Sequence, residues 1–152
     1  LDSLSILPML QGASLIDVGT GPGLPGIPLA LARSDLQIVL LDSNGKKIRF
    51  LREVVRVLQL LHVDVVQARV EAYKPNNLFD TVVSRAFSSA QDMVQKTRHL
   101  MAKNGQWLAM KGHVLDNERE ALDDLNDITY HIKPLEVTKA LGARCCILIK
   151  QK

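Results

Sequence analysis

Aromatic residues, cysteines and long hydrophobic segments are all scarce in this chain of 152 residues. Aromatic side chains make up 4% of it, which excludes a surface of stacked rings for single-stranded nucleic acid. No apolar run approaches the roughly 20 residues that span a bilayer, and the first residues lack the basic segment of a signal peptide. We therefore expect a cytoplasmic protein that has no membrane partner.

Metal-binding residue types are equally sparse. The two cysteines, Cys145 and Cys146, are neighbours in an apolar segment. Successive strand side chains point to opposite faces, so these thiols are poorly placed to share an ion. The histidines show no ligand spacing and stand at His62, His99, His113 and His131. We expect no metal site and two buried thiols.

The rest of the composition is typical of a globular protein. Hydrophobic residues are 47% and charged residues 23% of the chain, and the length fits a single domain over residues 1–152. A net charge of +3 and a pI near 9.0 favour an anionic partner, and we expect a monomer. The chain begins at Leu1 without a methionine, which indicates that an upstream part is missing.

Apolar segments of two kinds alternate along the chain. Strands are predicted over 15–18, 37–41, 63–67, 79–84 and 105–111, and helices over 25–33, 44–61, 90–102 and 115–125. Asn104-Gly105 is expected to form the turn before the fifth strand. The segments 129–137 and 144–150 are expected to be two antiparallel strands joined by a loop with Gly142, because no helix fits between them. This order predicts an α/β fold: a mostly parallel, seven-stranded sheet with helices on both faces and a C-terminal antiparallel strand pair.

The most informative segment is the glycine-rich stretch Asp17-Val-Gly-Thr-Gly-Pro-Gly-Leu-Pro-Gly26. It lies between a predicted strand and a predicted helix, an arrangement that brings bare backbone close to a nucleotide. Gly21, Gly23 and Gly26 match the dinucleotide pattern G-x-G-x-x-G, and Asp42 ends the second strand, where an acid binds ribose hydroxyls. The pattern alone leaves two classes of cofactor open.

Three observations favour S-adenosylmethionine over a nicotinamide dinucleotide. Pro22, Pro25 and Pro28 remove backbone N–H groups that would hold phosphates. Asp17 would repel a pyrophosphate, whereas it can face an ammonium or a sulfonium group. The closing antiparallel strand pair is typical of Rossmann-like class I methyltransferases. A nicotinamide-dependent dehydrogenase is the less favoured alternative.

An ordered series of motifs resembles the bacterial RsmG (GidB) family, the guanine-N7 methyltransferases of small-subunit 16S ribosomal RNA. The series comprises Ile16 to Pro28, Leu40-Leu-Asp-Ser43, Lys47-Ile-Arg-Phe-Leu-Arg52, Ala68-Arg-Val-Glu71, Phe79-Asp80, Ser84-Arg-Ala-Phe87 and Met110-Lys-Gly112. The resemblance covers essentially the whole chain. It implies a Rossmann-like methyltransferase fold, S-adenosylmethionine as the donor, and guanine N7 of the 16S ribosomal RNA or small subunit as the acceptor. It also implies a helical segment ahead of the domain, of which only the tail is present here.

The candidate cofactor residues come from two sources. The resemblance places contacts at Gly19, Leu24, Val70, Glu71 and Arg85, and Arg85 is also the candidate for positioning the acceptor. The turn and the second strand add Asp17, Gly21, Gly23 and Asp42. Guanine N7 carries a lone pair and no proton, so we assign no catalytic base and expect catalysis by positioning of donor and acceptor.

The predicted helix 44–61 has a basic side and an apolar side. Its apolar stripe, expected to be buried, comprises Ile48, Leu51, Val55 and Leu58. Its basic stripe begins close to Asp42, at the rim of the site, and either faces water or contacts phosphates. The RNA-binding candidates are Lys46, Arg49, Arg52 and, at the end of the fifth strand, Lys111, which contacts either RNA or a neighbouring loop. A methyltransferase of the same fold with another substrate, and a cofactor-binding module inactive through truncation, are the alternatives.

Overall fold

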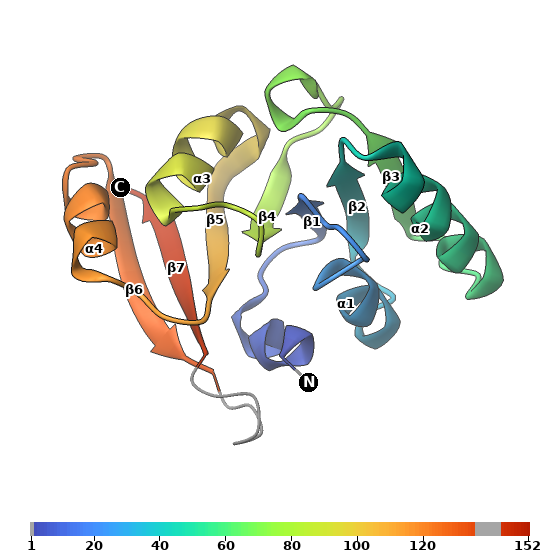
Figure 1. Ribbon diagram of the computed structural model, residues 1–152, viewed down its shortest axis with the longest axis horizontal. Coiled ribbons are helices and arrows are strands. Elements are labelled where there is room, and N and C mark those ends of the chain that lie inside the picture. Colours follow the sequence, from blue (N-terminus) through green and yellow to red (C-terminus); the bar gives the residue numbers. More distant parts are fainter. Residues whose placement is uncertain (1, 136–143) are drawn as a thin grey trace.

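A computed structural model, which describes residues 2–135 and 144–152, arranges the chain around one seven-stranded sheet (Figure 1). Its strands are β1 (Ser14–Val18), β2 (Gln37–Asp42), β3 (Val63–Gln67), β4 (Phe79–Ser84), β5 (Met101–Lys111), β6 (Ile128–Pro134) and β7 (Cys145–Gln151). The spatial order is β3-β2-β1-β4-β5-β7-β6. The first five strands of the chain, β1 to β5, pair in parallel, and β7 runs antiparallel to both β5 and β6. The predicted sheet and its C-terminal antiparallel pair are confirmed.

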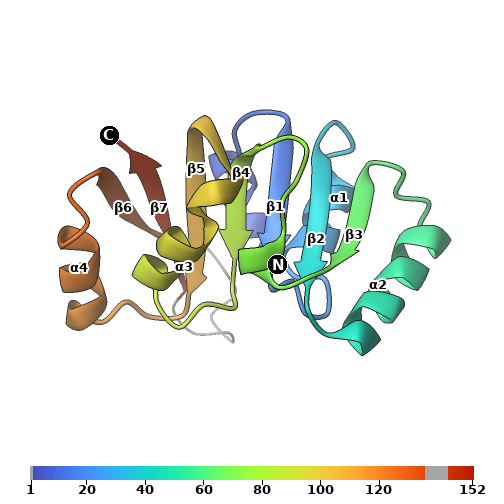
Figure 2. The same cartoon turned by 90° about the horizontal axis from the view of Figure 1, so that it is seen from above.

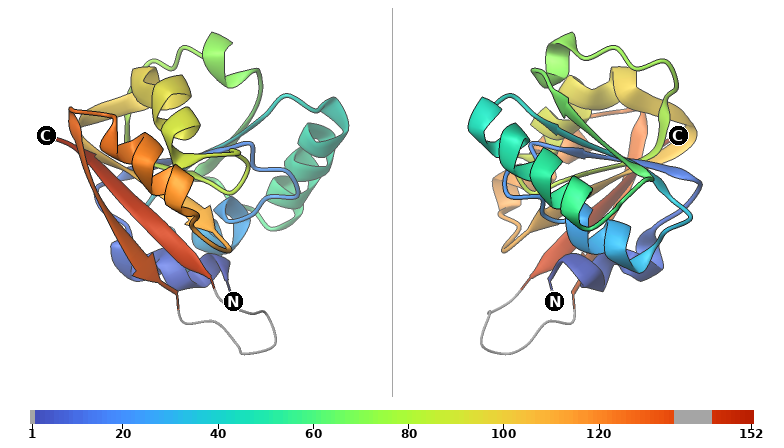
Figure 3. Two further views of the ribbon diagram at one scale, coloured as in Figure 1. Left: turned by 60° about the vertical axis from the view of Figure 1, so that its left-hand side comes forward. Right: turned by 90° about the vertical axis from the view of Figure 1, so that its right-hand side faces the viewer.

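Helices cover both faces of the sheet (Figure 2). The α-helices are α1 (Gly26–Ala32), α2 (Gly45–Val57), α3 (Ala90–Thr97) and α4 (Asp116–Asp123), and the 3-10 helices are η1 (Ser3–Met9), η2 (Val70–Ala72) and η3 (Arg98–Leu100). One apolar core packs α3 and α4 against the sheet, and a second packs η1, α1 and α2 against its other face. Figure 3 shows η1 and α1 on the side opposite α3. Because β1, β2, β4 and β5 contribute to both cores, these strands are mostly apolar.

The sheet places the strand ends that form the site. β1 lies between β2 and β4, so the chain crosses over in opposite directions on the two sides of β1. In open α/β sheets such a switch in strand order opens a crevice at the carboxyl ends of the strands. The segments that follow β1, β2 and β4 therefore meet at the carboxyl ends of these strands.

Two helices end several residues earlier than predicted. Helix α2 ends at Val57 and not at Leu61, because Gln59 adopts a left-handed φ of 54°. Leu58, predicted to be buried, is 44% exposed as a result, while Ile48 and Leu51 are fully buried. Helix α3 ends at Thr97, and the predicted helix end at 98–102 is instead η3 followed by the start of β5.

Asn104-Gly105 lies inside β5 and is not the predicted turn. Asn104 has a φ of 66°, and the pairing of β4 with β5 shifts register between Phe79 and Thr81. A β-bulge therefore replaces the turn, and it allows β5 to begin at Met101.

Trp107 lies on β5, and the two cysteines begin β7. Trp107 is fully buried, and its indole Nε1 donates a hydrogen bond to Thr97 Oγ1 at 2.8 Å. Cys146 is buried, and Cys145 is partly exposed. In the described ranges, no helix is long and apolar enough to cross a membrane, and no group of three or more metal-ligating side chains is assembled. The predicted loop with Gly142, and the end of the predicted strand 129–137, lie outside the described residues.

Candidate functional site

The glycine-rich turn between β1 and α1 is closed by its own hydrogen bonds. Gly19 and Thr20 donate their N–H groups to Leu41 O at 2.9 and 3.0 Å. The later N–H groups of the turn are also engaged: Gly21 with Asp42 Oδ2, Gly23 and Leu24 with Thr20 O, Gly26 with Asp17 Oδ2, and Ile27 with Gly23 O. Pro22 and Pro25 have no N–H to offer. Every backbone donor from residue 19 to 27 is thus committed within the protein, which leaves none for a pyrophosphate.

Gly19 is one of the positions in the turn that tolerate no side chain. Its φ is +66°, a left-handed conformation that L-residues adopt with strain. A Cβ atom built on it would lie 2.6 Å from the Cβ of Ala86, well inside van der Waals contact. The backbone of the turn at Gly19 therefore packs directly against Ala86, in the segment that follows β4.

Asp17 stabilises the turn through hydrogen bonds from inside the protein. Its side chain is fully buried, and Oδ2 accepts hydrogen bonds from Thr20 Oγ1 at 2.7 Å and from the Gly26 N–H at 2.9 Å. Oδ1 has no hydrogen-bond partner among the residues that the structure describes. Burial raises the pKa of Asp17 to about 7, against the opposing effects of the two hydrogen bonds and of the Arg85 charge. The sequence predicted that Asp17 faces the cofactor, but its carboxylate points into the turn.

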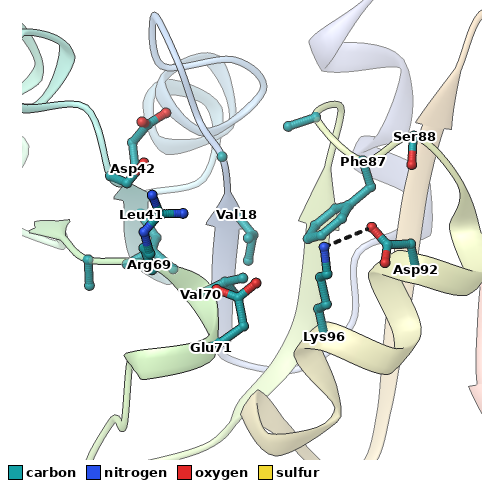
Figure 4. A pocket seen from close by; sticks show the side chains of 14 residues that line it. Val18, Leu41, Asp42, Arg69, Val70, Glu71, Phe87, Ser88, Asp92 and Lys96 are labelled. Carbon is teal, nitrogen blue, oxygen red and sulfur yellow. Dashed lines mark ion pairs between the residues drawn. The ribbon is translucent and has the colours of Figure 1, made fainter.

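A cavity of about 490 Å³ opens beside Gly19, at the carboxyl ends of β1, β2 and β4 (Figure 4). Of the predicted cofactor residues, four line it: Gly19, Asp42, Val70 and Glu71. Five do not, and these are Asp17, Gly21, Gly23, Leu24 and Arg85. The first four of these five belong to the turn or support it, whereas Arg85 faces elsewhere.

Asp42 is the best-oriented polar group in this cavity. Oδ2 accepts the Gly21 N–H at 2.9 Å, and Oδ1 accepts the Asn44 N–H at 2.9 Å. Asn44 in turn caps α2 by accepting the N–H groups of Lys46 and Lys47. Each carboxylate oxygen has a second lone pair, so Asp42 can still accept hydrogen bonds from a diol. The position predicted from the sequence is therefore fixed by the turn and by a helix cap.

The segment after β3 forms a second wall of the cavity. Ala68 donates its N–H to Asp42 O at 3.1 Å, which ties the end of β3 to the end of β2. Val70 begins η2, and its carbonyl oxygen lies 3.0 Å from His99 Nε2. Val70 and Glu71 are thereby held at the cavity, as the sequence predicted for these two residues.

The third wall was not identified from the sequence. It comes from the segment after β4 and from α3, and it consists of Ala86, Phe87, Ser88, Asp92 and Lys96. Lys96 Nζ lies 3.3 Å from Asp92 Oδ2, and Figure 4 shows Phe87 on the same side of the cavity as this ion pair. Ser89 caps α3 by accepting the Asp92 N–H at 3.0 Å, which was the available signal that a helix starts at this wall.

Arg85 and Lys111 line a second cavity of about 310 Å³. Lys111 Nζ donates to Phe87 O at 3.0 Å and pairs with Glu118 Oε1 at 3.3 Å, and its side chain is 15% exposed. Of the two roles predicted for Lys111, the structure shows the contact with a loop, and its contact with RNA stays a prediction.

The basic stripe of α2 is exposed. Lys46, Arg49 and Arg52 are exposed and form no salt bridge within the described part of the chain, whereas Arg56 pairs with Glu53. Phe50 on the same helix is 55% exposed. The three unpaired cations leave this face of α2 available to an anionic polymer.

Solved structures of low sequence identity share this fold. The mitomycin 7-O-methyltransferase MmcR aligns with a TM-score of 0.78 at 13% identity, over 99% of this chain and 53% of that chain. A SAM-dependent methyltransferase from Aquifex aeolicus aligns with a TM-score of 0.74 at 18% identity, over 99% and 90%. The fold is therefore the Rossmann-like fold of class I methyltransferases, as predicted.

Relatives of much higher identity define the family. The family model described as rRNA small subunit methyltransferase G, GidB, matches residues 1–145. Ribosomal RNA small subunit methyltransferase G of Legionella pneumophila is 56% identical over 148 residues, which are 97% of this chain and 69% of that protein. The protein of the same name from Photobacterium profundum is 45% identical over 100% of this chain and 73% of its own length. The chain belongs to the GidB family, the family of rRNA small subunit methyltransferase G.

Proposed function

We propose that this protein transfers a methyl group from S-adenosylmethionine to N7 of a guanine in 16S ribosomal RNA. The observation that carries the proposal is the first cavity, where Gly19, Asp42 and Val70 meet in a member of this family. A single sheet with a core on each face supports one domain over residues 1–152. It would act as a monomer in the cytoplasm, where its ribosomal acceptor is found.

The residues of the first cavity fit an adenosyl cofactor that has no phosphate. The backbone donors of the turn are all engaged, so a pyrophosphate would find no partner there. Asp42 is oriented to accept hydrogen bonds from the ribose hydroxyls. Val70 and Phe87, on two different walls, offer apolar surface to a purine, with Glu71 at the rim.

When bound, S-adenosylmethionine supplies an electrophilic methyl group on a sulfonium. Guanine N7 needs no deprotonation, so the protein's task is to hold the acceptor in line with that methyl group. Such positioning can contribute roughly 7–11 kcal/mol in well-oriented systems. Lys46, Arg49 and Arg52 would contact RNA phosphates outside the site.

Methyl transfer from radiolabelled S-adenosylmethionine to purified small ribosomal subunits, and to protein-free 16S RNA, tests this function. We expect incorporation that strand scission at 7-methylguanine maps to one guanine. Incorporation into a small molecule or protein only would favour a methyltransferase of the same fold with another substrate. Tight binding of S-adenosylhomocysteine without transfer to any acceptor would favour a cofactor-binding module.

A further inference from the structure

The short 3-10 helix η2 forms a wall of the first cavity, but it has few contacts of its own that fix it there. None of its three residues is buried, and no side chain caps its first turn. Its backbone hydrogen bonds are local, since the Ala72 and Tyr73 N–H groups donate back to Arg69 O at 3.0 and 3.1 Å. The position of Val70 and Glu71 in this wall therefore depends on contacts with other elements.

His99 makes the one hydrogen bond that joins η2 to another element in the described part of the chain. Its Nε2 lies 3.0 Å from Val70 O. His99 belongs to η3, which follows α3 directly, and α3 carries Asp92 and Lys96 of the third wall. In Figure 4 these two side chains lie across the cavity from Val70 and Glu71. The hydrogen bond therefore connects two of the walls between which a ligand would lie.

This hydrogen bond fixes a backbone direction that apolar packing does not fix. A carbonyl oxygen can only accept, so the imidazole Nε2 carries the hydrogen, in the neutral ring and in the imidazolium alike. Val70 also packs against an apolar core, but apolar contact is not directional. Because a peptide unit is planar, the direction of Val70 O sets the plane of the peptide that joins Val70 to Glu71. One imidazole thus orients both of these predicted cofactor residues.

We propose that His99 is a positioning residue for the cofactor and that its imidazole holds Val70 and Glu71 against the adenine. His99 is not among the residues that line the cavity, so it acts through Val70. Without the donor, η2 can move away from the adenine, which weakens binding although every contacting residue is still present. The inference rests on the proposed function, because it takes the ligand of the first cavity to be S-adenosylmethionine.

The test compares His99→Met with His99→Gln, two substitutions of similar length that differ in a hydrogen-bond donor. The amide of glutamine can donate to Val70 O in place of Nε2, whereas the thioether of methionine cannot donate. Isothermal titration calorimetry measures the affinity for S-adenosylhomocysteine and for 5′-methylthioadenosine, which lacks the amino-acid end. Urea denaturation measures the stability of each variant. Because His99 is exposed, His99→Ala is a second variant without a donor, to be used if His99→Met does not fold.

His62→Met is the matched control. His62 Nε2 lies 2.9 Å from the backbone oxygen of Ala30, in α1, so this variant loses a hydrogen bond of the same kind. His62 stands just before β3, at the amino ends of the strands, whereas the first cavity opens at their carboxyl ends. The control therefore separates a loss of stability from a loss of positioning.

We expect His99→Met to bind both ligands about three- to tenfold more weakly, the effect of losing one hydrogen bond. His99→Gln should stay within about twofold of the wild type, and His62→Met should lose stability but no affinity. Wild-type affinity in His99→Met, an equal loss in His99→Gln or in His62→Met, or a loss confined to S-adenosylhomocysteine would each overturn the proposal.

The two proposals fail in different ways. If the wild type does not methylate ribosomal RNA but binds S-adenosylhomocysteine in a way that depends on His99 as described, the function is wrong and the positioning role stands. If the wild type methylates ribosomal RNA and His99→Met keeps its full affinity for both ligands, the function stands and the positioning role is wrong.

Discussion

The two cavities are lined by neighbouring residues of the segment after β4, yet the protein groups that shape them differ. The first is shaped by backbone: a turn whose N–H groups are all engaged, with Asp42 oriented by two of the neighbouring amides. The second is shaped by long basic side chains, with Arg85 as the cation that has no salt-bridge partner in the described residues. A cationic sulfonium donor and an anionic polynucleotide acceptor require opposite electrostatics. The comparison shows that the first cavity is lined by three acidic and two basic side chains, whereas the second is lined by three basic side chains and one acidic side chain.

The largest effect is expected at Gly19, where the first cavity depends on bare backbone. Gly19→Asp should abolish measurable binding of S-adenosylhomocysteine, because the new Cβ would lie 2.6 Å from Ala86 Cβ at a φ of +66°. Isothermal titration calorimetry measures the loss, and circular dichroism verifies that the variant is folded. Gly112→Ala, in the second cavity, is the control and should bind normally. Affinity within twofold of the wild type in Gly19→Asp would remove the turn from the site.

Asp17 should make the stability of the first site depend on pH. Its folded-state pKa is about 7 and its ordinary value 3.8, so between these values the folded protein holds a proton that the unfolded chain has released. The contribution of Asp17 to stability is therefore full below about pH 4 and is lost as the pH rises toward 7, by a few kcal/mol in order of magnitude. Asp17→Asn should flatten this part of the curve of unfolding free energy against pH, measured by urea denaturation. The surface variant Asp124→Asn should keep the wild-type slope, and equal slopes in all three proteins would contradict the assignment.

Asp42 tests whether the oriented carboxylate binds the cofactor. Asp42→Asn replaces one of its two acceptor oxygens with a donor, and we expect S-adenosylhomocysteine to bind about 10- to 100-fold more weakly, since hydrogen bonds to charged groups contribute about 1.5–3 kcal/mol. Calorimetry provides the affinity. Asp35→Asn, which removes an exposed carboxylate paired with Arg33, is the control. A loss of equal size in both variants would point to net charge and not to the orientation of Asp42.

The smallest effect is expected outside both cavities, on the basic stripe of α2. Reversing the charges of Arg49 and Arg52 to Glu should weaken 16S RNA binding by about tenfold and lower its salt dependence by about two phosphate contacts. Cofactor affinity should not change. Filter binding at several salt concentrations measures both RNA quantities.

A pair of charge reversals near the amino ends of the strands, away from the site, controls for net charge. Arg33→Glu combined with Lys103→Glu changes the total charge equally but lies away from the site. If both double variants lose the same RNA affinity, the attraction is non-specific and the stripe is not part of the RNA surface.

Much of the fold follows from the order of apolar segments. Strands β3 and β4 have the predicted bounds, Val63–Gln67 and Phe79–Ser84, because both are short and rich in β-branched residues. The end of α2 was wrong, since its apolar pattern continues past Gln59 although the backbone there turns left-handed. The start of β5 was missed because a bulge at Asn104 has the same sequence signal as a turn.

The site was predicted in part for a similar reason. Strand ends mark where a ligand binds, and Asp42, Val70 and Glu71 line the first cavity as expected. Phe87 and Lys96 were missed because only the folded sheet brings α3 over the end of β1. The direction in which Lys111 points was also out of reach, since it depends on Glu118, from an element later in the chain.

The most direct test of the account is a calorimetric titration of the wild-type protein with S-adenosylhomocysteine and, separately, with NAD. Because the turn from Gly19 to Ile27 leaves no backbone donor for a phosphate, we expect one equivalent of S-adenosylhomocysteine to bind and NAD to release no heat. Binding of NAD at the same site, with no heat from S-adenosylhomocysteine, would contradict the account.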